Sequence, residues 1–459
     1  MKSRMLKKIQ HIHFVGIGGS GMSGIAEVLI NLGYKVSGSD LKETEVTQRL
    51  ASLGGAIFIG HKPEQVGDAH VVVTSSAVLP DNPEVVQAKK LKIPVIPRAE
   101  MLAELMRLKY AVTIAGCHGK TVTTSLVSMV LAEGGLDPTV VIGGRLKNIG
   151  SSAKLGRGEF MVAEADESDG SFLKLTPTIA LITNIDDDHL DYYKTLDNIK
   201  NAFVQFVNRV PFYGSIILCG EDQNIKSIIP QITRKYYTYG RGKNYDFYVE
   251  NVTYEGMHSE YDLYFSGRNL GRLRLNFPGA HNVLNSLGAA AVGVELGIEF
   301  EKIRKAFLDF TGVSRRLEIK VVKNDIMFMD DYGHHPTEIR ATLEAIKSIW
   351  PERRLLVIFQ PHRYTRTRDL AEKFGPSFAC ASRVWLTDIY SAGEKPIPGI
   401  SSSLILESFP PEKRKDVKLI SDREALIEEV VKTLRSKDVL LTLGAGDVYK
   451  IGDEILSEI

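Results

Sequence analysis

The sequence predicts an α/β protein of three domains. The chain has 459 residues, which corresponds to three domains of roughly 150 residues each. Two separate segments, at residues 11–40 and 111–131, each combine an apolar strand, a glycine turn and a helix with one apolar face. Repeated units of this kind form parallel sheets covered by helices. A hydrophobic content of 44% and a charged content of 25% are typical of a globular protein with large cores.

The charge balance and the cysteines exclude several classes of protein. Lys and Arg number 57 against 56 Asp and Glu, and a net charge of +1 gives no general electrostatic reason to bind nucleic acid or an anionic membrane. Three cysteines far apart in the chain cannot make a disulfide framework, which favours a reducing, cytoplasmic setting. No apolar run approaches the ~18 residues that span a bilayer. We therefore expect a cytoplasmic protein with no nucleic-acid or membrane partner, and the oligomeric state stays open.

The first glycine turn follows a strand predicted over residues 11–15. Four glycines come within the next six residues, and apolar positions at helical spacing follow from Met22. A second strand then leads to Asp40. In a dinucleotide-type turn of this pattern, glycines let the backbone close on a diphosphate, and the helix N-terminus supplies N–H donors. An ordinary tight turn between a strand and a helix is the alternative.

The same domain contains a further candidate at a strand end. A strand over residues 70–74 leads to Ser75, which is either a ligand contact or a helix cap. Two prolines in residues 91–97 precede an amphipathic helix over residues 99–108. That helix is expected to end the first domain at about residue 106.

The second glycine turn has the residues of a phosphate-binding loop. A strand over residues 111–115 leads to Gly-Cys-His-Gly-Lys-Thr at residues 116–121, and a helix follows. In such a loop the backbone N–H groups hold phosphate, Lys120 neutralises the transferring group and Thr121 ligates Mg²⁺. The usual first glycine is absent because Ile114 stands there. The sequence therefore predicts a shortened phosphate-binding loop.

Two later strands are expected to end beside this loop. The strand over residues 160–163 leads to Glu164, and the strand over residues 179–183 leads to an acidic segment that contains His189. A carboxylate and an imidazole at neighbouring strand ends could complete a divalent-metal site. Residues 186–188, three aspartates, are expected to form a solvated loop with helix-capping carboxylates. A core or capping role is the alternative for His189.

Five downstream motifs, together with both turns, resemble the Mur ligase family. In chain order they are FPGAHNVLNSLGAA (277–290), GVSRRLE (312–318), DDYGHHPTE (330–338), QPHRYTRTRDL (360–370) and YSAGE (390–394). The resemblance runs from the first glycine turn to the LGAGD segment near Gly444, which is nearly the whole chain. Two nucleotide-type turns also argue against a nicotinamide dehydrogenase, which needs only one.

The resemblance implies a fold and an activity. The fold would be α/β with three domains: a Rossmann-like UDP-binding domain (1–106), a P-loop-type ATPase domain (107–312) and a Rossmann-like α/β domain that binds the amino acid (313–459). The activity would be that of an ATP-dependent ligase of peptidoglycan precursor synthesis, with ATP and two Mg²⁺ ions as cofactors. It would join L-alanine to the lactyl carboxylate of UDP-N-acetylmuramate through an acyl phosphate. The alternatives are a sibling branch that adds a recycled tripeptide to the same UDP-sugar, and a catalytically silent UDP-sugar sensor.

The resemblance also implies site residues at the matching positions. UDP-sugar would contact Gly18, Gly19, Ser20, Gly21, Met22 and Ser23, with Asp40 and Ser75 as further candidates. ATP would contact Gly116, Cys117, His118, Gly119, Lys120, Thr121, Val122, Asn282, Asn285, Arg316 and Asp331. The metal ligands would be Thr121, Glu164 and His189. The amino-acid site would comprise His334, His362, Arg363 and Arg366, and the catalytic residues would be Lys120, His334, Arg363 and Arg366.

Some segments depart from the family or have a simpler interpretation. Cys117 and Val122 stand where the family commonly has threonine. A thiol beside a helix N-terminus ionises more easily, so we expect Cys117 to be sensitive to alkylation and protected by ATP. Without the family, residues 362–366 (HRYTR) would be a solvated basic strand end. The His334-His335 pair would cap a helix that begins at Pro336.

Overall fold

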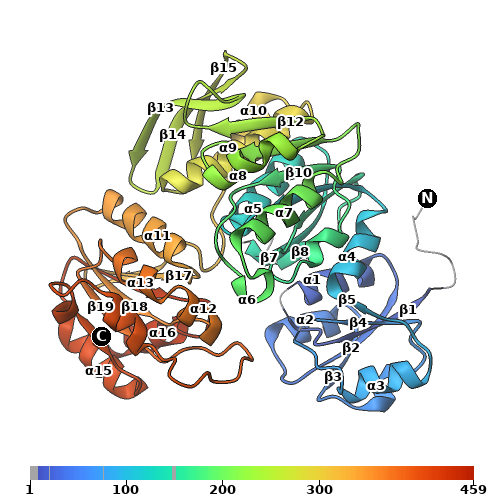
Figure 1. Ribbon diagram of the computed structural model, residues 1–459, viewed down its shortest axis with the longest axis horizontal. Coiled ribbons are helices and arrows are strands. Elements are labelled where there is room, and N and C mark those ends of the chain that lie inside the picture. Colours follow the sequence, from blue (N-terminus) through green and yellow to red (C-terminus); the bar gives the residue numbers. More distant parts are fainter. Residues whose placement is uncertain (1–8, 20, 76, 147–150) are drawn as a thin grey trace.

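The N-terminal part of the chain forms a parallel five-stranded sheet. The computed structural model describes residues 9–19, 21–75, 77–146 and 151–459, and these form three sheets, one in each part of the chain (Figure 1). The first sheet has the order β3-β2-β1-β4-β5. Its strands are β1 (His11–Val15), β2 (Lys35–Asp40), β3 (Ala56–Ile59), β4 (Val71–Thr74) and β5 (Val95–Pro97). Its helices are α1 (Met22–Asn31), α2 (Glu45–Ser52), α3 (Pro83–Lys90) and α4 (Arg98–Met106).

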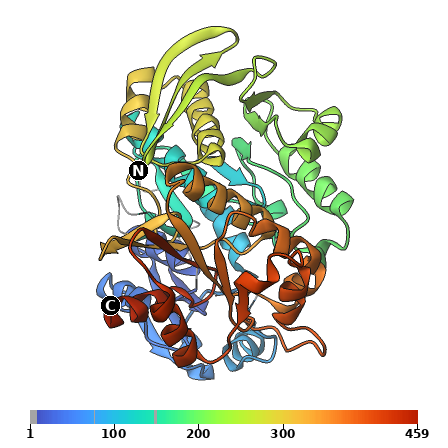
Figure 2. The same ribbon diagram turned by 90° about the vertical axis from the view of Figure 1, so that its left-hand side faces the viewer.

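The central part forms a ten-stranded sheet with the order β15-β14-β13-β12-β11-β10-β6-β9-β7-β8. The strands are β6 (Tyr110–Ala115), β7 (Thr139–Leu146), β8 (Ser151–Lys154), β9 (Phe160–Glu164), β10 (Ile179–Ile182), β11 (Ser215–Cys219), β12 (Tyr236–Gly240), β13 (Phe247–Glu255), β14 (His258–Phe265) and β15 (Arg268–Leu275). The helices are α5 (Lys120–Glu133), α6 (Leu190–Tyr193), α7 (Leu196–Val207), α8 (Gln223–Ile228), α9 (Ala280–Glu295) and α10 (Phe300–Leu308). The antiparallel strands β13 to β15 project away from the N-terminal part, at the top of Figures 1 and 2.

The C-terminal part, orange to red in Figure 2, forms a six-stranded sheet with the order β16-β17-β21-β18-β19-β20. Only β16 is antiparallel to its neighbour. The strands are β16 (Glu318–Lys323), β17 (Ile326–Asp331), β18 (Arg354–Phe359), β19 (Arg383–Leu386), β20 (Val417–Leu419) and β21 (Asp438–Leu443). The helices are α11 (Pro336–Ile349), α12 (Tyr364–Asp369), α13 (Ala371–Ser377), α14 (Ser403–Ser408), α15 (Arg423–Thr433) and α16 (Tyr449–Glu458).

The parallel register sets the position of the functional groups. Ile114 on β6 is paired with Glu164 on β9, and Ala115 is paired with Ile182 on β10. The three strands therefore end at one edge of the central sheet, where the phosphate-loop segment, Glu164 and the acidic segment meet. Helix α5 starts at this edge and packs against α9, and both helices bury most of their side chains. The core of the central part thus fixes the edge on which ligands of open α/β sheets bind.

The three-domain α/β fold is confirmed. Residues 362–366 do not form the basic strand end that their sequence suggests without the family, because Arg363 caps the short helix α12. The predicted helix start at Pro336 is confirmed: His335 is the N-cap of α11, and its side chain accepts a hydrogen bond from the N–H of Thr337. Within the described residues, no helix combines the length and apolar character needed to cross a membrane.

Candidate functional site

The second glycine turn lies where β6 ends and α5 begins. Gly119 caps α5 with a φ of 79°, a left-handed conformation that favours glycine. A Cβ at this position would lie 2.7 Å from Oδ1 of Asn285 on α9, so the turn closes tightly on that helix. Asn285 donates to Asn282, whose amide donates to the carbonyl of Pro278. The structure thus brings both predicted asparagines to the phosphate turn.

Lys120, the first residue of α5, is held by four hydrogen bonds. Its ammonium donates to both carboxylate oxygens of Glu167, at 2.9 and 2.8 Å, and to the carbonyls of Gly116 and Cys117, at 2.7 and 3.4 Å. Burial on its own lowers the pKa of Lys120, but the carboxylate of Glu167 outweighs burial, and the net pKa lies above the usual lysine value. Lys120 is therefore charged at neutral pH, in the turn that would receive phosphate.

Glu167, which sequence reasoning missed, joins the phosphate turn to the histidine of the acidic segment. Only 1% of Glu167 is exposed. Its Oε1 lies 3.7 Å from Nε2 of His189, and its backbone carbonyl accepts from the hydroxyl of Tyr193 at 2.6 Å. A buried carboxylate is stable only when it is paired, and Lys120 supplies the pairing. The sequence feature that could have identified Glu167 is its position in the EADESDGSF segment, three residues after Glu164.

The predicted metal ligands have atoms that a cation would satisfy. Oε1 of Glu164 and Nδ1 of His189 are buried and have no hydrogen-bond partner among the residues that the structure describes. Burial raises the pKa of Glu164, although a hydrogen bond from the side chain of Thr121 acts in the opposite direction. Carboxylate and hydroxyl oxygens suit Mg²⁺, and imidazole suits other divalent metals. Thr121, Glu164 and His189 therefore each offer an atom of a type that ligates divalent cations.

A cavity of about 410 Å³ lies between the central and C-terminal parts and is lined from both. Ligand pockets typically measure roughly 300–1,000 Å³. The cavity is lined by many of the residues predicted to bind ATP, namely His118, Gly119, Thr121, Val122, Asn282, Asn285, Arg316 and Asp331. Phe277, Leu317 and Ala341 add apolar surface. The pocket therefore offers an apolar wall for a base and polar groups for a ribose and phosphates.

His118 links the two parts across this cavity. Its Nε2 donates to Asp186 at 2.9 Å, and its Nδ1 lies 3.4 Å from Glu338 on α11. Burial lowers the pKa of His118, but the two carboxylates outweigh burial and raise the pKa to about 10. The possible ligand atoms of His118, Asp186 and His335 lie within 4.8 Å of one another, but a protonated imidazole does not ligate a metal. We interpret this group as an ionic bridge between domains.

The acidic segment 186–188 is not the solvated loop that the sequence predicted. Asp186 accepts a hydrogen bond from Thr337 on α11 at 2.7 Å, and Asp187 pairs with Lys373 on α13. Neither partner can be recognised from the local sequence, because both come from the C-terminal part. Contacts with the C-terminal part and with His118, rather than helix capping, therefore account for these carboxylates.

Asp188 and Arg366 form a buried ion pair between the same two parts. Nε and Nη2 of Arg366 donate to Oδ1 of Asp188 at 3.2 and 3.0 Å, and Nη2 also donates to Oδ2 at 3.2 Å. Each side chain is 6% exposed. The charge of Arg366 outweighs the effect of burial and holds the pKa of Asp188 well below its usual value. A pair of this kind is strongly destabilised when one partner is removed.

The four residues predicted to bind the amino acid lie together in the C-terminal part. The rings of His334 and His362 are 5.4 Å apart, and Nη1 of Arg366 donates to Nδ1 of His362 at 3.3 Å. Arg363 is the N-cap of α12, the short helix that contains Arg366. Burial and the charge of Arg366 lower the pKa of His334, and they lower the pKa of His362 to about 3. Both rings are therefore neutral, and Nδ1 of His334 donates to the carbonyl of Tyr332 at 3.1 Å.

The first glycine turn is held by β2. The N–H groups of Gly16 and Ile17 donate to the carbonyl of Ser39, and the N–H of Gly18 donates to the Asp40 carboxylate at 2.9 Å. Asp40, predicted as a ligand contact, thus stabilises the turn itself. Of the other predicted residues, Gly19, Gly21, Met22 and Ser23 belong to the turn and the start of α1, Ser75 lies beside Gly16, and Ser20 lies outside the described residues.

Arg98, the first residue of α4, brings a cation to this turn and was missed by sequence reasoning. Gly21 caps α1 with a φ of 78°, and a Cβ there would lie 2.5 Å from Nη1 of Arg98. Nη2 of Arg98 donates to Asp166 at 2.8 Å. Asp166 belongs to the same acidic motif as Glu164 and Glu167. Arg98 therefore connects the first glycine turn to the neighbourhood of the second.

Cys117 does not have the easily ionised thiol that the sequence predicted. Its Sγ is buried and accepts a hydrogen bond from the N–H of Asp186 at 3.1 Å. Burial, reinforced by the charge of Glu167, raises the pKa of Cys117 well above the usual thiol value. Lys120 acts in the opposite direction but is outweighed. The prediction is wrong because it considered the helix N-terminus and not the burial.

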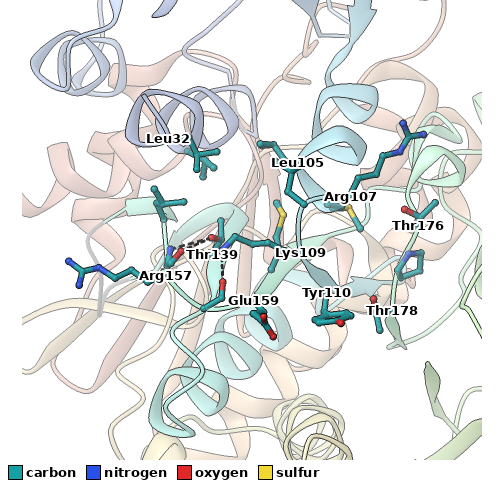
Figure 3. A pocket seen from close by; sticks show the side chains of 18 of the residues that line it. Leu32, Leu105, Arg107, Lys109, Tyr110, Thr139, Arg157, Glu159, Thr176 and Thr178 are labelled. Carbon is teal, nitrogen blue, oxygen red and sulfur yellow. Dashed lines mark hydrogen bonds between the residues drawn. The ribbon is translucent and has the colours of Figure 1, made fainter. Parts of the chain in front are cut away.

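A larger cavity, of about 1090 Å³, lies at the opposite edge of the central sheet, by the amino ends of β6 and β9 (Figure 3). Lys109 lies in this cavity and donates to the carbonyls of Gly156 and Gly158. None of the predicted site residues that the structure describes lines it. Because open α/β sheets bind ligands at the carboxyl ends of their strands, we place the functional site at the other edge.

Comparisons with protein families match each of the three parts. Residues 11–110 match the Mur ligase family catalytic domain, residues 114–293 the Mur ligase middle domain, and residues 315–446 the Mur ligase glutamate ligase domain. The three matches leave only short segments of the chain uncovered.

Individual relatives match over nearly the full length. A protein of Geotalea uraniireducens named UDP-N-acetylmuramate--L-alanine ligase is 56% identical, over 99% of both chains. The crystal structure of a UDP-N-acetylmuramate-alanine ligase from Thermotoga maritima is 30% identical, with a TM-score of 0.80 over 98% of both chains. The structure of a MurF ligase from Thermotoga maritima in complex with ADP is 15% identical, with a TM-score of 0.63 over 93% of this chain and 96% of that one, and shares the fold.

Proposed function

The chain belongs to the Mur ligase family, and we propose that it is an ATP-dependent ligase that joins L-alanine to the lactyl carboxylate of UDP-N-acetylmuramate. The reaction is a step in peptidoglycan precursor synthesis. The observation that carries the proposal is Lys120: its charged amine lies in a phosphate turn, beside a cavity that the C-terminal part closes. The full-length relative named for this reaction supports the choice of substrates.

We assign one substrate to each domain. The UDP-sugar would bind at the first glycine turn in residues 1–106, where Arg98 adds a positive charge. ATP would bind at the phosphate turn in residues 107–312, in the cavity that α11 closes. The amino acid would bind to residues 313–459, at the cluster of His334, His362, Arg363 and Arg366. The three sites meet around the acidic motif of Glu164 and Glu167.

The reaction needs activation of a poor acyl donor. The lactyl carboxylate attacks the γ-phosphorus of ATP, which gives an acyl phosphate and ADP. The amine of alanine then attacks the acyl carbon, and the tetrahedral intermediate expels phosphate. Negative charge develops on phosphoryl and acyl oxygens in both steps. Lys120 would stabilise the phosphoryl charge, because it is already oriented by Glu167 and needs little reorganisation.

The proposed cofactor is Mg²⁺, with two ions. Thr121 would hold one ion, and Glu164 and His189 would hold the second. Oε1 of Glu164 and Nδ1 of His189, which are buried and have no hydrogen-bond partner among the described residues, support the second site. Bound Mg²⁺ neutralises charge on the phosphate oxygens of ATP.

Alanine offers a carboxylate and an amine, and the C-terminal cluster suits both. The guanidinium of Arg363 or Arg366 can take the carboxylate with two parallel hydrogen bonds. The amine must lose a proton when it attacks. Nδ1–H of His334 donates to the carbonyl of Tyr332, so Nε2 of this neutral ring carries the lone pair and would accept that proton.

A coupled assay of ADP release tests the proposal. The full chain would be given UDP-N-acetylmuramate, ATP and Mg²⁺, with L-alanine, glycine, L-serine or the tripeptide as the amine. We expect the fastest ADP release with L-alanine. Faster release with the tripeptide would support the sibling branch instead. An absence of amine-dependent ADP release with every acceptor would refute a ligase and leave the UDP-sugar sensor.

A further inference from the structure

A buried chain of polar side chains crosses the N-terminal part and has no role in the reaction above. At its centre Glu84, on α3, is fully buried. Its carboxylate accepts hydrogen bonds from His13 at 3.1 Å, Ser39 at 2.6 Å and His61 at 2.8 Å. From His13 the chain continues through Ser37, His11 and Asp68.

Glu84 is an anion in spite of its burial. Burial raises the pKa of Glu84, but the hydrogen bonds from His13, Ser39 and His61 outweigh it and lower the pKa below the usual value. An ionised carboxylate only accepts hydrogen bonds. Each of the three neighbours must therefore direct a hydrogen at Glu84.

The count of hydrogens fixes the tautomer of His61. The hydroxyl of Ser39 has one hydrogen and donates it to Oε2 of Glu84. Nδ1 of His61 lies 2.8 Å from the same Oε2 and 2.9 Å from Oγ of Ser39. Both oxygens can only accept from the ring, so when the ring has a single hydrogen, that hydrogen lies on Nδ1. In this tautomer Nε2 of His61 carries a lone pair and acts as an acceptor.

His61 lies at the edge of the sheet where the sugar nucleotide would bind. It follows β3 through Gly60, whose N–H donates to the carbonyl of Asp40 at the end of β2. The backbone carbonyl of Ser39 holds the first glycine turn, while its hydroxyl contacts the ring of His61. In Rossmann-like domains the diphosphate lies at the glycine turn and the nucleoside near the end of β2. The ring of His61, 18% exposed, is thus on the nucleoside side.

We propose that His61 binds the uridine part of UDP-N-acetylmuramate and that Glu84 and Ser39 position its ring. Nε2 would accept a hydrogen bond from a ribose hydroxyl or from N3–H of uracil, which are the donors that uridine offers. Ionised phosphate oxygens offer no hydrogen, so this acceptor does not serve the diphosphate. The inference rests on the proposed function, because it takes the UDP-sugar as the ligand.

Calorimetric titration of the full chain tests the acceptor role. The probes are UDP and its 2′-deoxy, 3′-deoxy and N3-methyl analogues, each of which lacks one donor. We expect the natural chain to bind one analogue about tenfold more weakly than UDP. His61→Ala should bind UDP about tenfold more weakly and should no longer distinguish that analogue from UDP. If the variant discriminates among the probes as the natural chain does, the acceptor role is wrong.

The variant Glu84→Gln tests the positioning role. A glutamine has nearly the same volume but only one side-chain acceptor oxygen, so it cannot satisfy all three neighbours. We expect Glu84→Gln, like His61→Ala, to lose the difference in affinity between UDP and the weaker-binding analogue. Nitrogen-15 NMR of the His61 ring should show hydrogen on Nδ1 in the natural chain and a mixture of tautomers in Glu84→Gln. An unchanged tautomer together with unchanged UDP affinity would refute the positioning role.

Two controls separate this role from a loss of fold. Asp68→Asn changes the exposed far end of the same chain of hydrogen bonds and should keep the UDP affinity. A melting temperature lowered by Glu84→Gln, with the discrimination among UDP analogues intact, would indicate a purely structural network and overturn the proposal. If the natural chain does not bind UDP at all, the proposed function fails. If it binds UDP and His61→Ala binds equally well, only this inference fails.

Discussion

The two glycine turns have similar backbones but obtain their positive charge from different places. Each follows the first strand of its sheet and ends in a left-handed glycine that caps a helix, Gly21 with a φ of 78° and Gly119 with a φ of 79°. The N-terminal turn has no charged residue of its own and receives the guanidinium of Arg98 from α4. The central turn contains Lys120, which is paired with the buried Glu167.

On the proposed function, this difference separates a turn that would only bind its ligand from a turn that would take part in the reaction. At the N-terminal turn the ligand would keep its charge, so a partly exposed arginine from another element would be sufficient. At the central turn charge would be transferred, so the cation lies within the loop and its orientation is fixed before substrate arrives. The predictions below test this division, beginning with the largest effect.

Replacing Lys120 should distinguish the roles of the two turns most clearly. Lys120→Ala is expected to lower turnover by roughly 10³-fold, because the other cation of the loop, His118, is already paired with Asp186 and Glu338. UDP-sugar affinity should stay nearly unchanged, because it depends on the other turn. ADP release and calorimetric titration measure the two quantities. Equal loss of both would refute the division.

Neutralising the partner of the lysine should have a smaller effect of the same kind. Glu167→Gln keeps the shape but leaves Lys120 without its paired charge, so kcat should fall by about 10–100-fold, as for other groups that orient a catalytic residue. Asp169→Asn is the matched control, because among the described residues the carboxylate of Asp169, in the same motif, accepts a hydrogen bond from the N–H of Ser171 alone. A similar fall in kcat for both variants would show that the motif acts only through folding.

Removing the arginine of the first turn should affect binding. Arg98→Ala is expected to weaken UDP-sugar binding about tenfold, because a charge-assisted contact with the diphosphate is lost. Arg98→Lys should restore only part of the affinity, because lysine lacks the planar guanidinium that can donate two parallel hydrogen bonds. Arg107→Ala changes an exposed arginine near the end of the same helix and should have no effect. An Arg98→Ala variant with unchanged UDP-sugar affinity would contradict the comparison.

The smallest expected effect concerns the thiol of the central turn. Because the pKa of Cys117 is raised, its thiolate fraction at neutral pH is smaller than that of a free cysteine, and it rises only at higher pH. Alkylation by iodoacetamide at pH 7 should therefore be slow, and its rate should increase with pH beyond the range of an ordinary thiol. Peptide mapping by mass spectrometry measures this rate. Rapid modification at pH 7 would contradict the assigned burial.

Local patterns were sufficient to predict the elements that contain both turns. The strand expected over residues 111–115 is observed over Tyr110–Ala115, because an apolar run followed by a glycine turn is a short-range signal. The same holds for the cap at His335, which needs only the following proline and helix. The resemblance to a family added positions that no local pattern identifies, such as Asn285 and Arg316 beside the ATP cavity.

The missed residues have partners that are distant in sequence. Glu167 is 47 residues from Lys120, Arg98 is 68 residues from Asp166, and Asp188 is 178 residues from Arg366. A hydrophilic acidic segment therefore looks solvated until the C-terminal part covers it. Burial also reverses the expectation for Cys117, because the cost of a buried thiolate depends on neighbours that the turn sequence does not reveal.

If the amino acid binds as proposed, the pair of Asp188 and Arg366 would make amino-acid binding and domain closure thermodynamically linked. The guanidinium of Arg366 already donates hydrogen bonds to the carboxylate of Asp188. An alanine carboxylate that binds Arg366 would therefore have to displace Asp188. The net affinity is then the small difference between two strong contacts, and the displaced aspartate must find another partner or leave the interface. By linkage, an amino acid that binds Arg366 would weaken the Asp188–Arg366 contact by the same factor by which this contact weakens amino-acid binding. Asp188→Asn, which keeps Arg366 and removes the competing anion, should therefore raise the affinity for the amino acid.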